Sequence, residues 1–303
     1  RPPIKVVNNQ GALAIILFEG GLNLKFHELT HTGKAVKHLI LLGLPLSWFF
    51  GFLVCYWVAN LSITLSLLLS SILVVTGPTV ILPLIRQTKL KTRTSSLLKW
   101  EGIINDPIGI LLAVLVFQFV VASDFIALDK STILYLLGSI ASSILIGFGG
   151  GHFLKFVFEK GHVPEFLKLP MVLATVLSLY ALSNIFQEEI GLLTVTVMGI
   201  TMGNIGMLII YELRKFKENI TAILVPVVFI ILTADLNLKD LMGLNWRVCL
   251  FLFCFLFLVR PAAVWLSTIG TGLSWKERVF VGWIAPRGIV ATSIAGLLGL
   301  KLQ

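Results

Sequence analysis

A stretch that reads EGIINDPIG places two carboxylates and an amide within an otherwise apolar part of the chain. Glu101 and Asp106 are five residues apart, so on a helix they point roughly 140° away from each other. They therefore do not form a close pair that shares one proton, and we expect two separate roles. Asn105 lies on the same helix face as Glu101. Pro107 has no N–H to donate to the carbonyl of Ile103, which leaves that oxygen free near Asp106.

These groups are hard oxygen ligands, which suit a small cation better than a soft metal. Glu101 needs a basic partner at membrane depth, and Arg287 in the segment APRG is the candidate that we favour. Removing one member of such a buried pair is strongly destabilising. On this interpretation Asp106 remains the unpaired titratable group. The alternative makes Asp106 a structural partner of Arg260 or Arg287.

The composition indicates an integral membrane protein. Of 303 residues, 57% are hydrophobic and only 13% are charged, against roughly a quarter charged in soluble domains. A bilayer-spanning helix needs about 20 mostly apolar residues. We expect an all-α chain with no soluble domain and spans near 4–22, 38–57, 63–85, 100–122, 131–157, 169–186, 190–210, 220–235, 247–268 and 279–300.

The net charge of +9 comes from basic loops that lie on one side of the expected spans, and it does not indicate a nucleic-acid-binding surface. Loops on one side of the alternating spans are rich in lysine and arginine, and those on the other side are nearly free of them. The positive-inside rule assigns the basic loops to the cytoplasm. These basic loops are 23–38, 86–99, 155–168, 211–219 and 271–278.

Two pairs of segments predict an inverted-topology repeat. The sequence IILFEGGLNLK near the N-terminus is echoed by IILTADLNLK near residue 239, and the two leave the membrane on opposite sides. A proline and a glycine also interrupt one span in each half, at Gly77–Pro78 and at Pro286–Gly288. Paired broken helices in transporters mark the substrate site, so we expect these two to cross at an ion site.

The motifs FEGGLNL, TGPTV, EGIINDP and WIAPRGIVA, in this order across nearly the whole chain, resemble the monovalent cation/proton antiporters. Specifically, they resemble the sodium/proton exchanger branch, in which an Asn-Asp pair replaces Asp-Asp. This resemblance implies two inverted repeats of six helices, a homodimer and a core domain that moves against a dimer-forming domain. It also implies that residues 1–303 form a single transmembrane domain that lacks the first two helices and the last.

The resemblance also assigns roles to individual residues. It implies that Asp106 binds the cation or the proton, with Asn105 and Thr76 beside it and Glu19 reaching the site from the cytoplasmic funnel. It assigns Glu101 and Arg287 to a structural ion pair. Two departures concern oxygen ligands, because Gly77 and Gly102 stand where many members have Asp and some have Ser.

We therefore expect a secondary transporter, not an enzyme, that exchanges a monovalent cation (Na⁺, K⁺ or Li⁺) for H⁺ by alternating access. One carboxylate that binds either one cation or one proton predicts electroneutral exchange. A cation channel or another ion-coupled transporter is the alternative. We expect a multi-pass protein of the plasma (inner) membrane, with no cofactor, no metal centre and no nucleic-acid partner. The spacing of the histidines gives no evident set of metal ligands.

Overall fold

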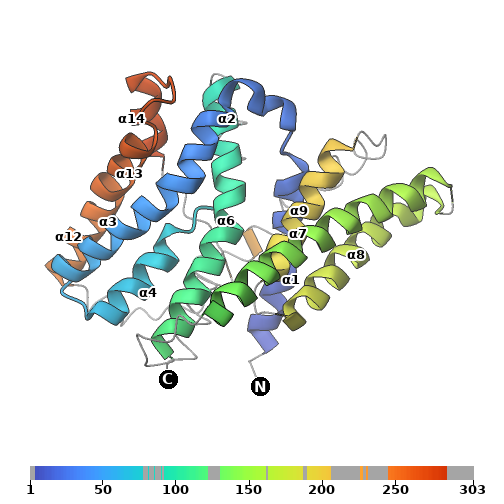
Figure 1. Ribbon diagram of the computed structural model, residues 1–303, viewed down its shortest axis with the longest axis horizontal. Coiled ribbons are helices and arrows are strands. Elements are labelled where there is room, and N and C mark those ends of the chain that lie inside the picture. The colour runs from blue at the N-terminus through green and yellow to red at the C-terminus, as the bar shows by residue number, and fades with distance from the viewer. Residues whose placement is uncertain are drawn as a thin grey trace. The chain divides into compact units, whose positions relative to one another are not determined.

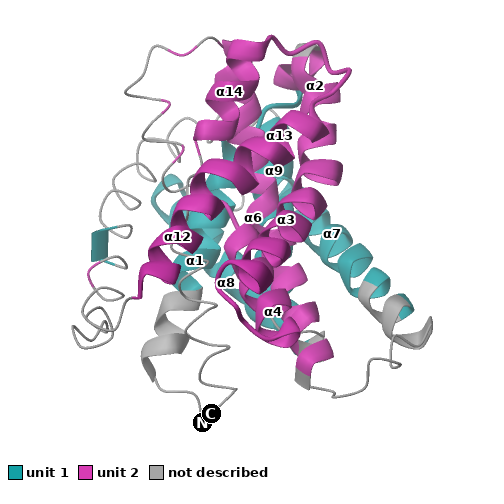
Figure 2. Cartoon of the chain, turned by 90° about the vertical axis from the view of Figure 1, so that its left-hand side faces the viewer, with its two compact units in different colours: residues 1–26, 124–228 teal, residues 27–123, 229–303 magenta. Residues whose placement is uncertain are grey.

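In the computed structural model, every secondary-structure element among the described residues is a helix (Figure 1). These residues are 4–77, 92–121, 130–161, 163–186, 190–205 and 245–284, with positions 81, 85, 90, 226, 227 and 230. The chain divides into two compact units (Figure 2): residues 1–26 with 124–228 form unit 1, and residues 27–123 with 229–303 form unit 2.

The described helices of unit 1 are α1 (Ile4–Leu22), α7 (Lys130–Glu159), α8 (Glu165–Phe186) and α9 (Ile190–Asn204). Helix α9 is the centre of this unit and packs against the other three. Glycines allow the close contact: a Cβ added at Gly199 would overlap the Phe18 carbonyl oxygen of α1, and one at Gly147 would overlap the Thr194 carbonyl oxygen. Small residues that let backbones approach are typical of helix packing in membranes.

Unit 2 holds the remaining described helices. They are α2 (Leu29–His38), the π-helix η2 (Leu39–Gly43), α3 (Leu44–Trp57), α4 (Ile63–Val74), α6 (Thr92–Val121), α12 (Trp246–Cys254), the π-helix η3 (Phe255–Val259), α13 (Arg260–Ser267) and α14 (Trp275–Trp283). The short 3₁₀-helix η1 (Phe26–Glu28) lies where the chain passes from unit 1 to unit 2.

Two spans of unit 2 have the same order of parts. Each contains a π-helix followed by a helix with proline as its second residue, Pro45 in α3 and Pro261 in α13. A proline cannot donate to the carbonyl four residues earlier, and a π segment accommodates such a gap. The π-helix η2 packs against α13, while η3 packs against α3. This reciprocal, antiparallel packing is the arrangement that an inverted repeat predicts.

The span expected over residues 63–85 is interrupted. Helix α4 ends at Val74, residues 75–77 are not helical, and Ile81 is helical again. Helix α14 ends at Trp283, and Ile284 is extended, two residues before Pro286. Pro78, Pro286, Arg287 and Gly288 lie outside the described residues.

Five helical stretches in the described part of the chain are long and apolar enough to cross a membrane: Thr32–Trp57, Thr92–Phe117, Leu137–Glu159, Glu165–Ile185 and Trp246–Ser267. Three shorter apolar helices accompany them, Gly11–Leu22, Ile63–Val74 and Ile190–Asn204. These eight correspond in position to eight of the ten expected spans. Most of the span expected at 220–235 and most of the one at 279–300 fall outside the described residues.

Candidate functional site

The acidic residues of EGIINDPIG lie in the middle of α6. We expected a helix that begins near residue 100, but α6 begins at Thr92. Hydropathy marks only the part of a helix at lipid depth, and the additional turns carry polar side chains that are stabilised at the helix end. The Lys99 ammonium, for example, lies 2.5 Å from a carboxylate oxygen of Glu28 in the same unit.

Glu101 is paired with Arg260 of α13. The Arg260 Nη1 and Nη2 atoms donate to the two carboxylate oxygens at 2.5 and 2.9 Å. Both side chains are buried, with 2% of the Glu101 side chain and 7% of the Arg260 side chain exposed. A bidentate, charge-assisted pair of this kind is among the strongest polar contacts in proteins.

This pairing corrects the prediction that Arg287 is the partner of Glu101. Both carboxylate oxygens of Glu101 are already bonded to the Arg260 guanidinium, and Arg287 itself lies outside the described residues. The alternative in which Arg260 neutralises Asp106 is also wrong, because Arg260 is bonded to Glu101. The sequence did contain a signal for Arg260, because it is an arginine inside an apolar span and a proline follows it directly. In the structure the π-helix η3 ends directly before Arg260.

Asp106 is fully buried, and neither of its carboxylate oxygens has a hydrogen-bond partner among the described residues. The same holds for the Asn105 amide oxygen and the Thr76 hydroxyl, whose side chains are also buried. An unpaired polar group at this depth is costly. Unit 2 therefore holds four buried oxygen atoms, from Thr76, Asn105 and Asp106, that no described residue satisfies.

Two glycines of α6 position Asp106 against the interrupted part of the α4 span. A Cβ at Gly109 would lie 3.3 Å from the Cα of Val75, and one at Gly102 would lie 3.9 Å from the Gly77 carbonyl oxygen. Gly102 and Gly109 are seven residues apart and share a face of α6 with Asp106, which is four residues after the first. Asp106 therefore faces the non-helical residues that include Thr76.

The two carboxylates point to different surroundings, as their spacing predicts. The Asp106 face of α6 packs against the non-helical residues 75–77, whereas Glu101 binds Arg260 of α13. Pro107 lies inside α6, so the Ile103 carbonyl lacks the usual donor four residues later. A carboxylate, an amide oxygen, a hydroxyl and a carbonyl together form a set of hard oxygen ligands.

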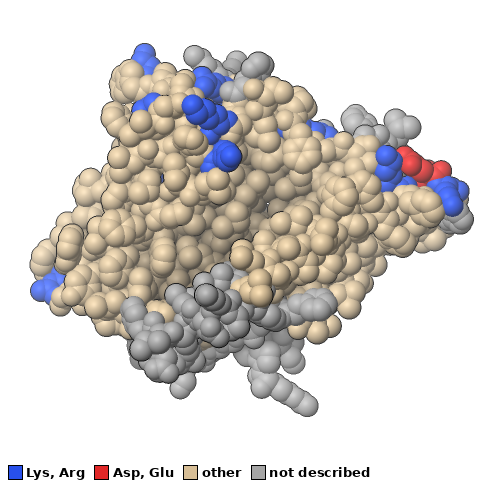
Figure 3. Space-filling view, viewed as in Figure 1, with Lys and Arg blue, Asp and Glu red and all other residues tan. Residues whose placement is uncertain are grey.

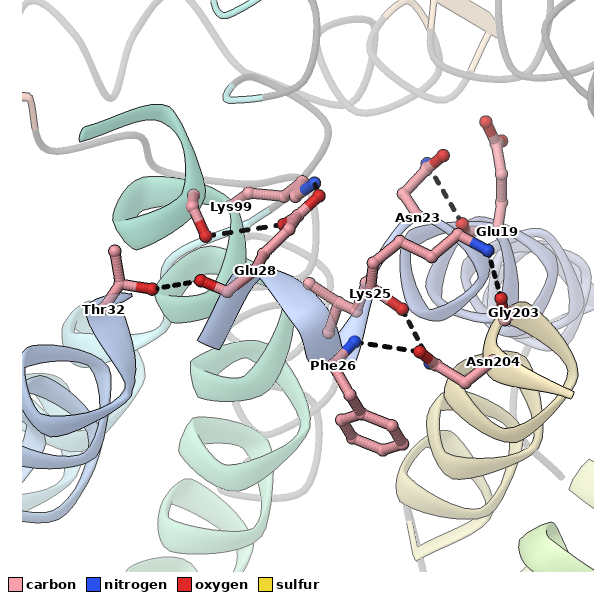
Figure 4. Close-up of polar contacts among 11 residues, drawn as sticks. Glu19, Asn23, Lys25, Phe26, Glu28, Thr32, Lys99, Gly203 and Asn204 are labelled. Carbon is pink, nitrogen blue, oxygen red and sulfur yellow. Dashed lines mark hydrogen bonds and ion pairs between the residues drawn. The ribbon is translucent and has the colours of Figure 1, made fainter. Parts of the chain in front are cut away.

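Glu19, the remaining predicted site residue, belongs to unit 1. It lies on α1 and is buried, and its carbonyl accepts a hydrogen bond from the Asn23 side chain. The segment that follows α1 is fixed to the end of α9, where the Asn204 side chain binds the Leu24 carbonyl and the Phe26 N–H (Figure 4). A role of Glu19 at the ion site stays a prediction.

The connection between the units is anchored on both sides of the crossing at residues 26 and 27. On the unit 1 side, the Lys25 ammonium donates to the Gly203 carbonyl at the end of α9. On the unit 2 side, Glu28 binds Lys99 and accepts a hydrogen bond from Ser96 on α6 (Figure 4).

The chain is similar to known cation/proton antiporters over nearly its whole length. The transmembrane model of the sodium/hydrogen exchangers matches residues 10–302. A K⁺/H⁺ antiporter NhaP of Alkalimonas amylolytica is 26% identical over 297 residues, which are 97% of this chain and 51% of the relative. The Na⁺/H⁺ antiporter ApNhaP of Aphanothece halophytica is 24% identical, over 92% of this chain and 55% of the relative.

The solved structure of the sodium proton antiporter MjNhaP1 from Methanocaldococcus jannaschii has the same fold. It superimposes with a TM-score of 0.83 at 21% identity, and the match covers 97% of this chain and 72% of that chain. The chain spans about half the length of the first two curated relatives. It is a polytopic, all-α integral membrane protein, and it belongs to the sodium/hydrogen exchanger family.

Proposed function

We propose that the protein containing this chain is a secondary active transporter that exchanges a monovalent cation for a proton, with Asp106 as the group that binds either one. The observation that carries the proposal is the fully buried Asp106 carboxylate, both of whose oxygens lack a partner in the described part of the chain. Its relatives are named as Na⁺/H⁺ and K⁺/H⁺ antiporters, which supports exchange over a channel.

The mechanism rests on competition for one carboxylate. A monovalent cation can be held by the Asp106 carboxylate with the Thr76 hydroxyl and the Asn105 amide oxygen as neutral ligands. A proton on Asp106 removes the charge that attracts the cation, so the two species exclude each other. A loaded site is neutral, whereas an empty, charged site crosses the low-dielectric membrane interior only at a high cost in free energy. Alternating access of the loaded forms alone therefore couples cation movement to proton movement.

The Glu101–Arg260 pair holds this site in shape. It joins α6 to α13 within unit 2 and neutralises both buried charges. Because Glu101 is neutralised by Arg260, Asp106 is the buried carboxylate of α6 that can bind a cation or a proton in turn. One charge that is neutralised by one cation or one proton gives electroneutral exchange, which is tested by imposing a membrane voltage. A transport rate that responds clearly to voltage would contradict it.

The function is tested by proton flux in vesicles that contain the full-length protein. A pH gradient is imposed, and sodium, potassium and lithium salts are added in turn, with Asp106→Asn as the matched control. We expect one or more of these cations to dissipate the gradient, and we expect no dissipation in the variant. Cation flux without proton flux would favour the channel, and the ranking of the three salts identifies the preferred cation. The homodimer that the resemblance implies is part of the proposal and is tested by the molecular mass of the purified protein in detergent.

A further inference from the structure

One end of unit 2 carries basic side chains that have no acidic partner in the described part of the chain. Lys34 and Lys37 on α2 and Lys276 on α14 are exposed, and Arg278 is partly exposed. None of the four makes an ion pair or a hydrogen bond with a described residue, and Arg278 Nε is among the buried atoms without a partner. We call these four residues the basic rim.

The acidic side chains nearest to the basic rim in the sequence are occupied elsewhere. Glu28 is bound to Lys99 at 2.5 Å. Glu277 closes a capping box at the start of α14, where its carboxylate accepts hydrogen bonds from the Ser274 N–H and hydroxyl. The charge of the basic rim is therefore available to an anionic partner from outside the chain.

Contacts within unit 2 bring the elements of the basic rim to the same end. The end of α2 meets the end of α13, where His38 Nδ1 lies 3.2 Å from the Ser267 carbonyl oxygen. The start of α6 meets the turn between α13 and α14, where Arg93 donates to the Gly272 carbonyl at 3.2 Å. Figure 3 shows blue side chains gathered over α2 and α14, without red beside them.

Each of the two helices continues from its lysines into an exposed apolar stripe. One turn beyond Lys37 lies Leu41, 59% exposed. On α14 the exposed residues Phe280 and Trp283 follow Lys276 at helical spacing, and Trp283 is 67% exposed. In a membrane protein such side chains face acyl chains, and a lysine at a span end extends its ammonium to headgroup depth.

We propose that the basic rim binds the headgroups of anionic lipids in the surrounding leaflet, with their acyl chains against the two apolar stripes. The continuity of charge and apolar surface on one helix face matches a lipid, which has both parts in the same order. An acidic soluble segment would use the charge but leave the stripes uncovered. Anionic headgroups attract lysines near the membrane surface, and this site is independent of whether Asp106 transports cations.

A basic tip in unit 1 provides the matched control. Lys155 lies 3.8 Å from Glu159 on α7, and Lys168 is paired with Glu165 on α8. The Lys160 ammonium lies over the Phe156 ring, 4.2 Å from its centre. Figure 3 shows red and blue side by side at this tip. It has three lysines, as many as the basic rim, but two of them are paired with glutamates of the same tip.

The test uses the purified full-length protein in mixed micelles of phosphatidylglycerol and phosphatidylcholine, with the retained lipid counted by native mass spectrometry. We expect phosphatidylglycerol to be enriched. The variant Lys34→Gln/Lys37→Gln/Lys276→Gln should lower this enrichment by about fivefold for each lysine. The control Lys155→Gln/Lys160→Gln/Lys168→Gln should retain it, and the melting temperatures show that both variants are folded.

Three results would overturn the proposal. Unchanged enrichment in the first variant would show that the basic rim does not hold the lipid. An equal loss of phosphatidylglycerol enrichment in both variants would show that lipid binding follows the net charge of the protein and not the basic rim. Binding of soluble polyglutamate with the same dependence on Lys34, Lys37 and Lys276 would identify an acidic protein segment as the occupant instead.

Discussion

In unit 1 the helices meet through close glycine contacts, whereas in unit 2 such contacts are accompanied by a buried ion pair between α6 and α13. The polar groups of α9 are satisfied locally: the Thr194 hydroxyl donates to Ser183, and the Thr196 and Thr201 hydroxyls donate to carbonyls one turn earlier. Packing of this kind fixes the distance between helices and leaves little for a ligand to bind.

Unit 2 contains both kinds of buried acid. Glu101 is neutralised by two hydrogen bonds from Arg260, while Asp106, five residues later on the same helix, has no partner in the described part of the chain. The two units therefore differ in how their buried polar groups are satisfied. Within α6, Glu101 is a paired carboxylate, and we propose that Asp106 is the one that binds the transported ion. Both contrasts can be tested by substitution.

The largest effect on transport is expected from Asp106→Asn. The amide binds neither the cation nor the proton usefully, so exchange should fall to the background of empty vesicles. Because Asp106 has no hydrogen-bond partner among the described residues, the variant should also melt at the same temperature as the parent protein or above it. Transport is measured as proton flux, and melting as loss of the folded protein in detergent. A variant that transports normally, or that unfolds well below the parent, would contradict this assignment.

The largest effect on stability is expected from Arg260→Gln. It leaves the Glu101 charge buried and unpaired, which costs about 3–5 kcal/mol. The double variant with Glu101→Gln should be less destabilised than the sum of the two single variants. Arg287→Gln is the control, and its effect should add to that of Glu101→Gln. Additivity for Arg260 with coupling for Arg287 would restore the pairing that we first expected from the sequence.

A smaller loss of stability, without a change in cation preference, is expected in unit 1. In Gly147→Ala the new methyl group overlaps the Thr194 carbonyl oxygen of α9, which costs about 1–3 kcal/mol. Gly149→Ala is the matched control two residues away, because a Cβ there has nothing within 4 Å, and it should gain up to about 1 kcal/mol of helix propensity. Denaturation of the two purified variants checks the opposite signs.

The smallest effect is expected at the connection between the units. Glu28→Gln removes a partly exposed ion pair with Lys99 and should cost no more than about 1 kcal/mol. The loss should shrink as salt is raised, because the remaining exposure allows screening. A loss as large as that of Arg260→Gln would mean that this anchor contributes as much as the buried pair.

The different surroundings of Glu101 and Asp106 could be predicted from the sequence because the evidence for them is local. Two acids five residues apart on one apolar helix must point in different directions, and Pro107 marks the same turn. The interruption near Gly77 was predictable for the same reason, since residues 75–77 are non-helical directly before Pro78. The resemblance added Thr76 and Asn105, whose side-chain oxygens, like those of Asp106, have no hydrogen-bond partner among the described residues.

What could not be predicted depends on contacts between distant segments. Arg260 and Arg287 are both arginines within apolar spans, and only the packing of α13 against the rest of unit 2 favours the first as the partner of Glu101. The start of α6 was missed because hydropathy does not report helix beyond the lipid. The glycine contacts of α9 depend on which helices are its neighbours, and sequence spacing alone does not specify that.

The most direct test of the central claim is the number of protons released when a cation binds to Asp106. Binding of sodium or potassium to the purified full-length protein is measured by calorimetry in buffers of different ionisation enthalpy, at a pH where the free site is protonated. We predict one proton released for each cation bound, and no binding in Asp106→Asn. Cation binding without proton release, or release that persists in the variant, would contradict competition at this carboxylate.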